Sequence, residues 1–159
     1  MTYYAVYDKN DPDHRTVNKY TITWKNWDGT VLTTSEVDYG ATPEYNGTPP
    51  TRQNTAQYTY SFLGWDPMIA AVSGEATYTA QFDYTVNAYT VTWKNWDGTV
   101  LETDEDVSYG TEPHFDGETP VRAADDENHY VFAGWDDDST VKGDKIITAT
   151  FTPAAHVFD

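Results

Sequence analysis

Cysteine is absent from the 159 residues of this chain. The sequence can therefore form neither a disulfide framework nor a thiolate metal site, and it offers no cysteine nucleophile. Long apolar runs are also absent, so we expect no insertion into a membrane. The amino terminus has neither a basic start nor an apolar stretch, and we expect no signal peptide in it.

Basic residues are scarce. Nine lysines and arginines are outnumbered by 26 aspartates and glutamates, which gives a formal net charge of −17. A chain this acidic is repelled by phosphate backbones and by anionic lipid surfaces. We therefore expect neither a nucleic acid nor a membrane surface as partner.

Sequence motifs that signal catalysis are also missing. The four histidines have no H-x-x-x-H or H-E-x-x-H spacing, and no G-x-S-x-G segment occurs. Acidic stretches at residues 8–13, 125–127 and 136–138 lack the D-x-D-x-D-G spacing of a calcium loop. We interpret these stretches as solvated loops, and we expect a non-enzymatic protein with no catalytic residues, no metal site and no cofactor.

Aromatic residues, in contrast, are plentiful. Thirteen tyrosines, six tryptophans and six phenylalanines make up 16% of the chain, and threonines are frequent. Tyr, Trp, Thr and Val suit the pleated, half-buried surface of a sheet. Long windows of Ala, Leu, Glu and Lys at helical spacing are missing, so the composition predicts a mostly β protein, α+β at most.

The sequence contains an internal repeat. The run WKNWDGTVL occurs at residues 24–32 and again at residues 93–101. The match continues on both sides, with one residue inserted in the second copy, and defines repeat 1 as residues 19–87 and repeat 2 as residues 88–159. An active site is usually built once, so the duplication favours a folding device that is used twice.

The first 18 residues carry part of a further copy. Thr2–Asp8 aligns with Thr77–Asp83, the end of repeat 1. We therefore expect residues 1–18 to hold the closing strand of a preceding, truncated repeat, followed by a linker.

The start of each repeat is typical of a β-hairpin. Tyr20, Ile22 and Trp24 alternate with polar residues, which is the period of a half-buried strand. Asp28-Gly29 follows, and an Asp-Gly pair supplies the two positive-φ positions of a tight two-residue turn. The same turn is expected at Asp97-Gly98 in repeat 2.

The rest of repeat 1 predicts two more strands. They cover Tyr58–Trp65 and Thr77–Asp83, and Gly64 inside the first indicates a bulge or a close backbone approach. The proline-rich segment at residues 41–57 is expected to be a loop, with one helical turn near residues 51–56.

The six tryptophans fall into two groups by strand alternation. Trp24 and Trp65, with their counterparts Trp93 and Trp135, are expected in the core, because a unit of about 69 residues needs large aromatics to fill its interior. Trp27 and Trp96 fall on the opposite face. For these two we keep two interpretations open, further core packing or an exposed surface that binds a ligand. They are the candidate ligand-binding residues, and Asp28, Gly29, Asp97 and Gly98 are the candidate structural turn.

The repeated motifs resemble a known family. Both copies carry, in order, Tyr-Thr-(Ile/Val)-Thr-Trp, WDGTVL, Tyr-Gly, Pro-x-Arg, aromatic-x-Phe-x-Gly-Trp-Asp and a threonine-rich closing strand. This order resembles the Listeria–Bacteroides repeat, the family that includes the B repeat of internalin B. The resemblance implies tandem β-grasp-like (ubiquitin- or SUMO-like) modules in an elongated arrangement, as found in secreted or wall-attached bacterial surface proteins. It brings no shared catalytic motif.

Charge distinguishes the two repeats. Residues 19–87 carry 7 acidic and 3 basic side chains, a net charge of −4, whereas residues 88–159 carry 16 and 4, a net charge of −12. Repeats with a shared core and different surface charge behave like a scaffold whose faces specialise.

Two functional hypotheses follow. The first is a non-enzymatic structural or adhesive stalk module, extracellular or attached to a Gram-positive-type cell wall, that acts as a semi-rigid spacer with neighbouring repeats as its contacts. Its signal and anchor are expected outside this sequence. The second is a carbohydrate- or host-protein-binding module that uses Trp27 and Trp96.

Overall fold

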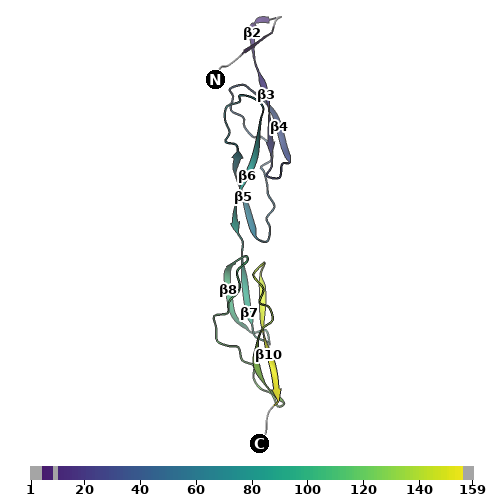
Figure 1. Cartoon of the computed structure of the whole chain (residues 1–159), viewed down its shortest axis with the longest axis vertical. Helices are drawn as coiled ribbons and strands as arrows, with labels where there is room; N and C mark the ends of the chain where they lie inside the picture. Colours follow the sequence, from purple (N-terminus) through teal and green to yellow (C-terminus); the bar gives the residue numbers. More distant parts are fainter. Residues whose placement is uncertain (1–4, 9–10, 156–159) are drawn as a thin grey trace. The chain divides into compact units, whose positions relative to one another are not determined.

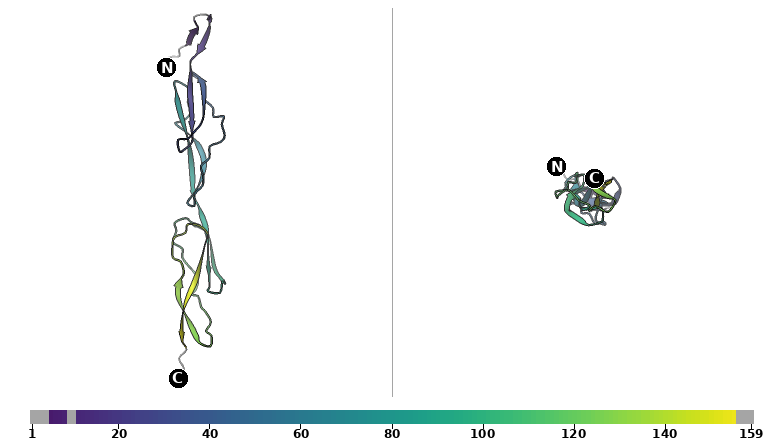
Figure 2. Two further views of the ribbon diagram at one scale, coloured as in Figure 1. Left: turned by 90° about the vertical axis from the view of Figure 1, so that its right-hand side faces the viewer. Right: turned by 90° about the horizontal axis from the view of Figure 1, so that it is seen from below.

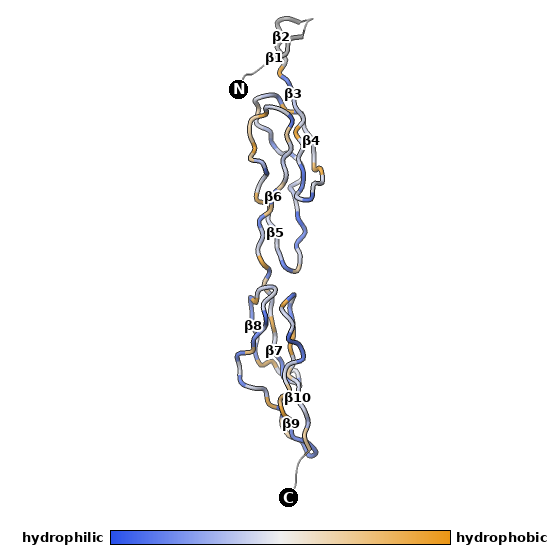
Figure 3. The backbone as a smooth tube through the Cα atoms, in the orientation of Figure 1, coloured by the Kyte–Doolittle hydropathy of each residue, from blue (hydrophilic) through white to orange (hydrophobic). Residues whose placement is uncertain are grey.

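A computed structural model describes residues 5–8 and 11–155 of the chain, with only the backbone described for residues 5–16. The described residues form ten β-strands and no helix (Figure 1), which confirms the expectation of a mostly β chain. Accordingly, this part of the chain contains no helix long and apolar enough to span a membrane. Hydrophobic residues come in short stretches separated by hydrophilic ones (Figure 3).

The strands of repeat 1 form one four-stranded sheet in the order β4-β3-β6-β5. Its members are β3 (Lys19–Lys25), β4 (Val31–Asp38), β5 (Tyr58–Asp66) and β6 (Ala76–Val86). β3 pairs antiparallel with β4 and parallel with β6, so the first and last strands of the repeat lie side by side. This central pair can be followed in Figures 1 and 2.

Repeat 2 builds the same sheet in the order β8-β7-β10-β9. Its members are β7 (Ala88–Lys94), β8 (Val100–Ser108), β9 (Asn128–Trp135) and β10 (Lys145–Ala155). β7 again pairs antiparallel with the second strand and parallel with the last. Two tandem β modules are therefore confirmed. The β-grasp assignment stays a prediction, because the segments joining the second and third strands contain no helix.

The inserted residue of repeat 2 is absorbed as a bulge in β8. Tyr89 pairs with Val107, but Val91 pairs with Asp104, so two residues of β8 lie opposite one residue of β7. Asp106, inside this bulge, has a φ of 57°. Aspartate is one of the few residues other than glycine that adopts this left-handed conformation readily.

A short sheet precedes repeat 1. Strand β1 (Ala5–Asp8) pairs antiparallel with β2 (Asp11–Val17). Strand β2 lies where the sequence predicted a linker, and the beginning of the predicted closing strand, Thr2–Tyr4, lies outside the described residues. The assignment of residues 1–18 to a truncated repeat stays a prediction.

The chain divides into two compact units. The first comprises Met1–Gln53 and Tyr60–Tyr84, and the second comprises Asn54–Thr59 and Thr85–Asp159. Most of the repeat 1 sheet lies in the first unit, except the start of β5 and the end of β6, and the whole repeat 2 sheet lies in the second.

Within the second unit, Asn87 fixes the segment at residues 54–59. Its Nδ2 donates to the carbonyls of Thr55 (2.8 Å) and Ala56 (3.1 Å), and its Oδ1 accepts from the Thr59 hydroxyl at 2.6 Å. The Tyr89 hydroxyl donates to the Ala56 carbonyl as well. The chain around Asn87 is therefore held by side-chain hydrogen bonds within the second unit.

Trp24 is the centre of the core of repeat 1. Its side chain is completely buried, and Ile22, Val72 and Tyr78 are buried around it. Its ring meets Trp65 edge-to-face at a centroid distance of 4.8 Å and stacks on Tyr78 at 4.9 Å. Aromatic pairs in these geometries add stability beyond the area that they bury. The expected core role of Trp24 and Trp65 is confirmed, with Trp65 partly buried.

Repeat 2 uses the same arrangement around Trp93. Its ring meets Trp135 edge-to-face at 4.8 Å, and Phe115 lies 5.4 Å away. On β10, Ile147 pairs with Trp93 where Tyr78 pairs with Trp24 in repeat 1. An aliphatic side chain thus replaces the stacked tyrosine without changing the pattern.

The hairpin turn differs from the expected two-residue turn. Gly29 has a φ of 87°, but Asp28 is not in the positive-φ region. The Gly29 N–H donates to the Asn26 carbonyl (2.9 Å) and the Asn26 N–H donates to the Thr30 carbonyl (2.8 Å), which makes a three-residue loop closed by a glycine. The Asp28 carboxylate accepts the Thr30 N–H at 3.0 Å, and this bond lowers the pKa of Asp28.

Asp97 and Gly98 repeat this geometry. Gly98 has a φ of 89°, and its N–H donates to the Asn95 carbonyl at 2.9 Å. The Asp97 carboxylate accepts the Thr99 N–H at 3.0 Å, which lowers the pKa of Asp97. The prediction of positive φ at both central residues was wrong in both repeats, because the aspartate is used as a hydrogen-bond acceptor and only the glycine enters the left-handed region.

The expected helical turn near residues 51–56 is also wrong, since this segment is irregular. The Thr51 carbonyl accepts from Asn26 Nδ2 at 2.9 Å, so it bonds the hairpin tip and not a following N–H. The Thr55 hydroxyl accepts the N–H groups of Gln57 (3.2 Å) and Tyr58 (3.0 Å). Threonine hydroxyls that bond nearby backbone favour turns over helix. Gly134, the counterpart of Gly64 in repeat 2, lies at a register shift between β9 and β10, which is the kind of bulge that a glycine inside a strand indicates.

One polar contact is present in the core of repeat 2 and missing from the core of repeat 1. The Trp93 indole Nε1 donates to Asp104 Oδ2 at 2.8 Å. At the matching position in repeat 1 stands Ser35, and the buried Trp24 Nε1 and Ser35 Oγ have no hydrogen-bond partner among the described residues. A buried donor without an acceptor lowers stability.

We predict that Ser35→Asn stabilises repeat 1 by about 1 kcal/mol, because the amide oxygen of the new side chain accepts the indole N–H of Trp24. In repeat 2, Asp104→Ala should destabilise the fold by about 1–3 kcal/mol, because it removes the acceptor of the Trp93 indole N–H. Asp104→Asn is the control, since it keeps an acceptor for Trp93. Urea unfolding followed by tryptophan fluorescence measures each change. Equal losses for Asp104→Ala and Asp104→Asn would show that the indole hydrogen bond contributes nothing.

We also predict that Gly29→Val destabilises repeat 1 by about 1–3 kcal/mol, because a β-branched residue is strained at a φ of 87°. No neighbouring atom lies within 4 Å of the point that a Cβ would occupy here, so the loss comes from backbone conformation and not from a clash. Gly29→Asn should cost less, since asparagine tolerates this region. Thermal unfolding that ranks the two variants equally would contradict the assignment.

Candidate functional site

Trp27 and Trp96 are exposed at the tips of the two hairpins. Their relative exposures are 45% and 46%, which agrees with an exposed surface and not with core packing. Each tryptophan follows an asparagine whose Oδ1 accepts the backbone N–H of that tryptophan at 2.9 Å. The asparagine is Asn26 for Trp27 and Asn95 for Trp96. The asparagine side chains thereby fix the backbone that carries the indoles.

An arginine lies between each of these tryptophans and a tyrosine. The Arg52 guanidinium carbon is 4.0 Å from the centroid of the Trp27 ring and 3.9 Å from that of Tyr60. In repeat 2, Arg122 is 4.0 Å from Trp96 and 3.8 Å from Tyr130. We call these sets the Trp–Arg–Tyr stacks.

The stacks join parts of each repeat that are distant in sequence. The tryptophan comes from the hairpin loop, the arginine from the long irregular segment, and the tyrosine from the third strand. Sequence reasoning singled out the tryptophans and missed the arginine and the tyrosine. The recurrence of Pro-x-Arg and of the tyrosine at matching positions in both repeats was the available signal.

The stacks limit what the indoles can bind. The guanidinium covers one face of each ring, and such a contact at an exposed site is worth about 0.5–1 kcal/mol. The rest of the indole stays open, next to guanidinium N–H donors. This combination offers an apolar ring for stacking and donors for hydroxyl or carboxylate oxygens.

The two stacks differ at their tyrosine hydroxyls. Tyr60 accepts from Arg52 Nη2 at 3.3 Å. Tyr130 instead donates to Asp125 Oδ2 at 2.6 Å, and this bond, with the N–H groups of Asn128 and Glu127, lowers the pKa of Asp125 to about 2. Part of the acidic stretch at residues 125–127 therefore stabilises its own turn.

The acidic stretch at residues 136–138 is also built into the fold. Asp136 accepts the Thr148 N–H at 2.8 Å. Asp137 accepts from the Ser139 hydroxyl (2.6 Å) and N–H (2.8 Å) and lies 3.1 Å from Lys145 Nζ, contacts that lower its pKa to about 2. Our interpretation of solvated loops left out these bonds. For residues 8–13 no side chain is described.

A carboxylate cluster that sequence reasoning did not single out lies on repeat 2. Glu102, Asp104 and Asp116 have oxygens within 4.8 Å of one another, the one such group among the described His, Cys, Asp and Glu residues. Burial raises the pKa of Glu102, as do its two carboxylate neighbours. Glu102 and Asp104 belong to β8 and Asp116 belongs to a loop, so no local spacing in the sequence indicates the cluster. Carboxylate oxygens are ligands for hard cations, but Asp104 already accepts from Trp93 and Glu102 from the Asp116 N–H.

Comparison of this chain with known proteins finds little similarity. No family model matches the chain, and no curated protein matches it. The resemblance to the Listeria–Bacteroides repeat therefore rests on the motifs alone. Among solved structures, the chain is similar to streptococcal high identity repeats in tandem (SHIRT) domains 3–4 from a cell surface protein, with 16% identity over 85% of this chain and 99% of that chain. The TM-score is 0.39, which is too low to show that the two proteins have the same fold.

Proposed function

We propose that this chain is a non-enzymatic structural segment of a bacterial surface protein, extracellular or wall-attached, that acts as a semi-rigid spacer. The observation that carries the proposal is the duplication of the whole folding device. Each repeat has its own buried tryptophan, its own glycine-closed hairpin loop and its own Trp–Arg–Tyr stack. The buried tryptophans and the glycine-closed loops stabilise each module, and a spacer built of similar units requires such stable modules.

The residues at the join support a semi-rigid spacer. The stretch Tyr84–Ala88 has no run of glycine and serine, the composition that makes a linker flexible. Asn87 lies in this stretch, and its side-chain hydrogen bonds to residues 55, 56 and 59 order this part of the second unit. The resemblance of the repeated motifs to the Listeria–Bacteroides repeat supports the surface location.

We predict that small-angle scattering of the whole chain gives an extended particle with one well-defined maximum dimension. Inserting four Gly-Ser pairs between Val86 and Asn87 should broaden the distance distribution, because the added segment is a flexible coil. A compact, near-spherical particle would contradict the spacer function. Equal profiles for the native and inserted chains would contradict its stiffness.

The second candidate function is binding of a glycan or a host surface protein through Trp27 and Trp96. It is favoured by the exposure of both indoles at equivalent hairpin tips. Exposed tryptophans are enriched at binding surfaces because they offer a large ring with a polar N–H. The second repeat would supply a second, equivalent contact, which raises avidity when both engage together.

We predict that the Trp27→Ala/Trp96→Ala double variant loses binding on an array of glycans and matrix proteins. The loss of the cation–π contacts should lower stability by only about 0.5–1 kcal/mol per repeat. Leu63→Ala is the control, since Leu63 is 69% exposed and lies outside both stacks. The candidate fails if the native chain binds nothing on the array, or if the double variant is unfolded.

A further inference from the structure

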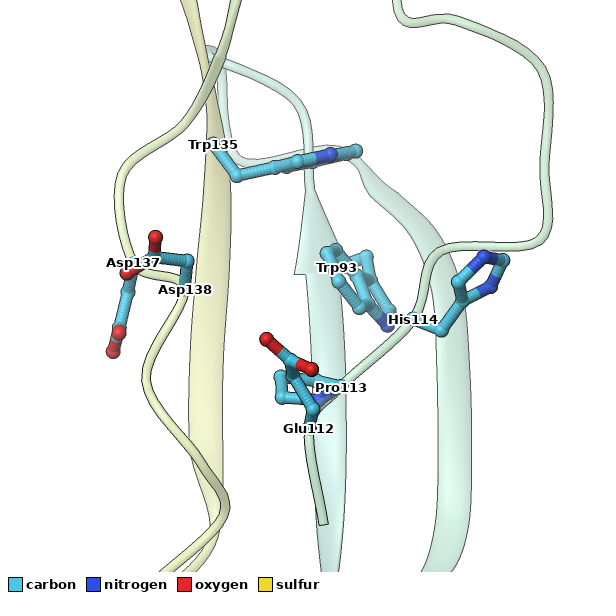
Figure 4. Close-up of a pocket in the computed structure, with 7 residues that line it drawn as sticks. All are labelled: Trp93, Glu112, Pro113, His114, Trp135, Asp137 and Asp138. Carbon is cyan, nitrogen blue, oxygen red and sulfur yellow. The ribbon is translucent and has the colours of Figure 1, made fainter.

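Repeat 2 contains a pocket beside its core tryptophan. The pocket has a volume of about 330 Å³ and lies between β7, the segment at residues 112–114 and the loop that follows β9. Trp135 lies across one end, Trp93 and His114 lie on one side, and Asp137 and Asp138 lie on the other (Figure 4). The carboxylate of Glu112 points into the space between them.

The apolar wall of the pocket is aromatic. Trp93 and Trp135 meet edge-to-face there, and an adjoining hollow of about 410 Å³ continues along Trp93 and Trp135 to Phe115 and Phe132. The face of an indole attracts a cation through the quadrupole of the ring. Volumes of this size are at the lower end of those that hold small ligands.

The other wall is anionic. Asp137 is held ionised by Ser139 and Lys145, contacts that lower its pKa to about 2. Glu112 and Asp138 are exposed, and neither has a hydrogen-bond or ion-pair partner among the described residues. Of the basic side chains nearby, Lys145 bonds Asp137 at 3.1 Å and the His114 ring bonds Asp116 at 2.8 Å. The acceptors of Glu112 and Asp138 therefore remain available.

Repeat 1 shows which parts of the pocket the fold requires. Its tryptophan pair, Trp24 and Trp65, is the same, because that pair is the core. The three acidic residues are not the same, since repeat 1 has Thr42, Pro67 and Met68 at the positions of Glu112, Asp137 and Asp138. Because repeat 1 folds in the same way without these carboxylates, folding does not explain why repeat 2 has Glu112 and Asp138 at these positions.

We propose that this pocket binds a primary ammonium group, the side chain of a lysine in an extended peptide. The indole of Trp135, which is only partly buried, attracts the cation and its methylene stem, and the unpaired carboxylates of Glu112 and Asp138 accept its N–H donors. A quaternary ammonium has no donors and leaves both carboxylates unpaired. The site is separate from the Trp–Arg–Tyr stacks and does not depend on the spacer function.

The test is an NMR titration of the whole ¹⁵N-labelled chain with the peptide acetyl-Gly-Lys-Gly-amide. We expect saturable shifts of the Trp135 indole signal. The same peptide with norleucine in place of lysine should give none, and tetramethylammonium should bind at least about tenfold more weakly than the lysine peptide. No saturable shift with the lysine peptide, or an equal response to norleucine, would overturn the proposal. Equal binding of tetramethylammonium would overturn the assignment to a primary ammonium.

Charge variants separate the pocket from the general acidity of repeat 2. Glu112→Gln/Asp138→Asn should weaken lysine binding by about tenfold or more. Asp126→Asn/Glu127→Gln removes the same charge from exposed residues elsewhere and should leave binding unchanged. Equal weakening by both pairs would show non-specific attraction and overturn the proposal. Thr42→Glu/Met68→Asp supplies two carboxylates beside Trp65 and should create lysine-dependent shifts there, whereas their absence would contradict the role given to the carboxylates.

Discussion

The edge-to-face contact between the tryptophan of the first strand and the tryptophan of the third strand holds each repeat together. Trp24 meets Trp65, and Trp93 meets Trp135, each at a centroid distance of 4.8 Å. A repeat of about 69 residues without disulfides has a small interior, and these large rings fill much of it. The contact joins the hairpin to the other half of the sheet, so the parallel central pair and the long irregular segment are placed by it.

Strand alternation predicted the buried side of β3, Ile22 and Trp24, from the sequence, because side chains of a strand point to opposite faces in turn. Trp27 is exposed for a different reason, since β3 ends at Lys25 and Trp27 lies in the hairpin loop. Interactions between distant segments could not be predicted in this way. The three-residue hairpin loop depends on hydrogen bonds of Asn26 and Asp28 to backbone groups, and the Arg52 stack depends on a loop that no local pattern positions. The carboxylate cluster around Glu102 likewise comes from separate parts of repeat 2.

The features that the two repeats share have structural roles, whereas some of the acidic residues found only in repeat 2 do not. The core, the hairpin loops and the stacks recur, and each has a direct role in holding a module together. The acidic residues of repeat 2 mostly do not recur: Asp104 bonds the indole of Trp93, Asp125 bonds Tyr130, and Glu112 and Asp138 have no structural partner among the described residues. The excess charge of repeat 2 is thus partly structural and partly free for recognition, which is how a duplicated scaffold acquires a face of its own.

Hydrogen exchange of the six tryptophan indole N–H groups, followed by NMR, tests the central claim that each repeat is built on one buried tryptophan and displays another. The structure predicts slow exchange for Trp24 and Trp93, which are almost fully buried, and fast exchange for Trp27 and Trp96, which are nearly half exposed. Protection of an amide or indole proton reports the free energy of the opening that exposes it. Equal protection of Trp27 and Trp24, or of Trp96 and Trp93, would contradict the account.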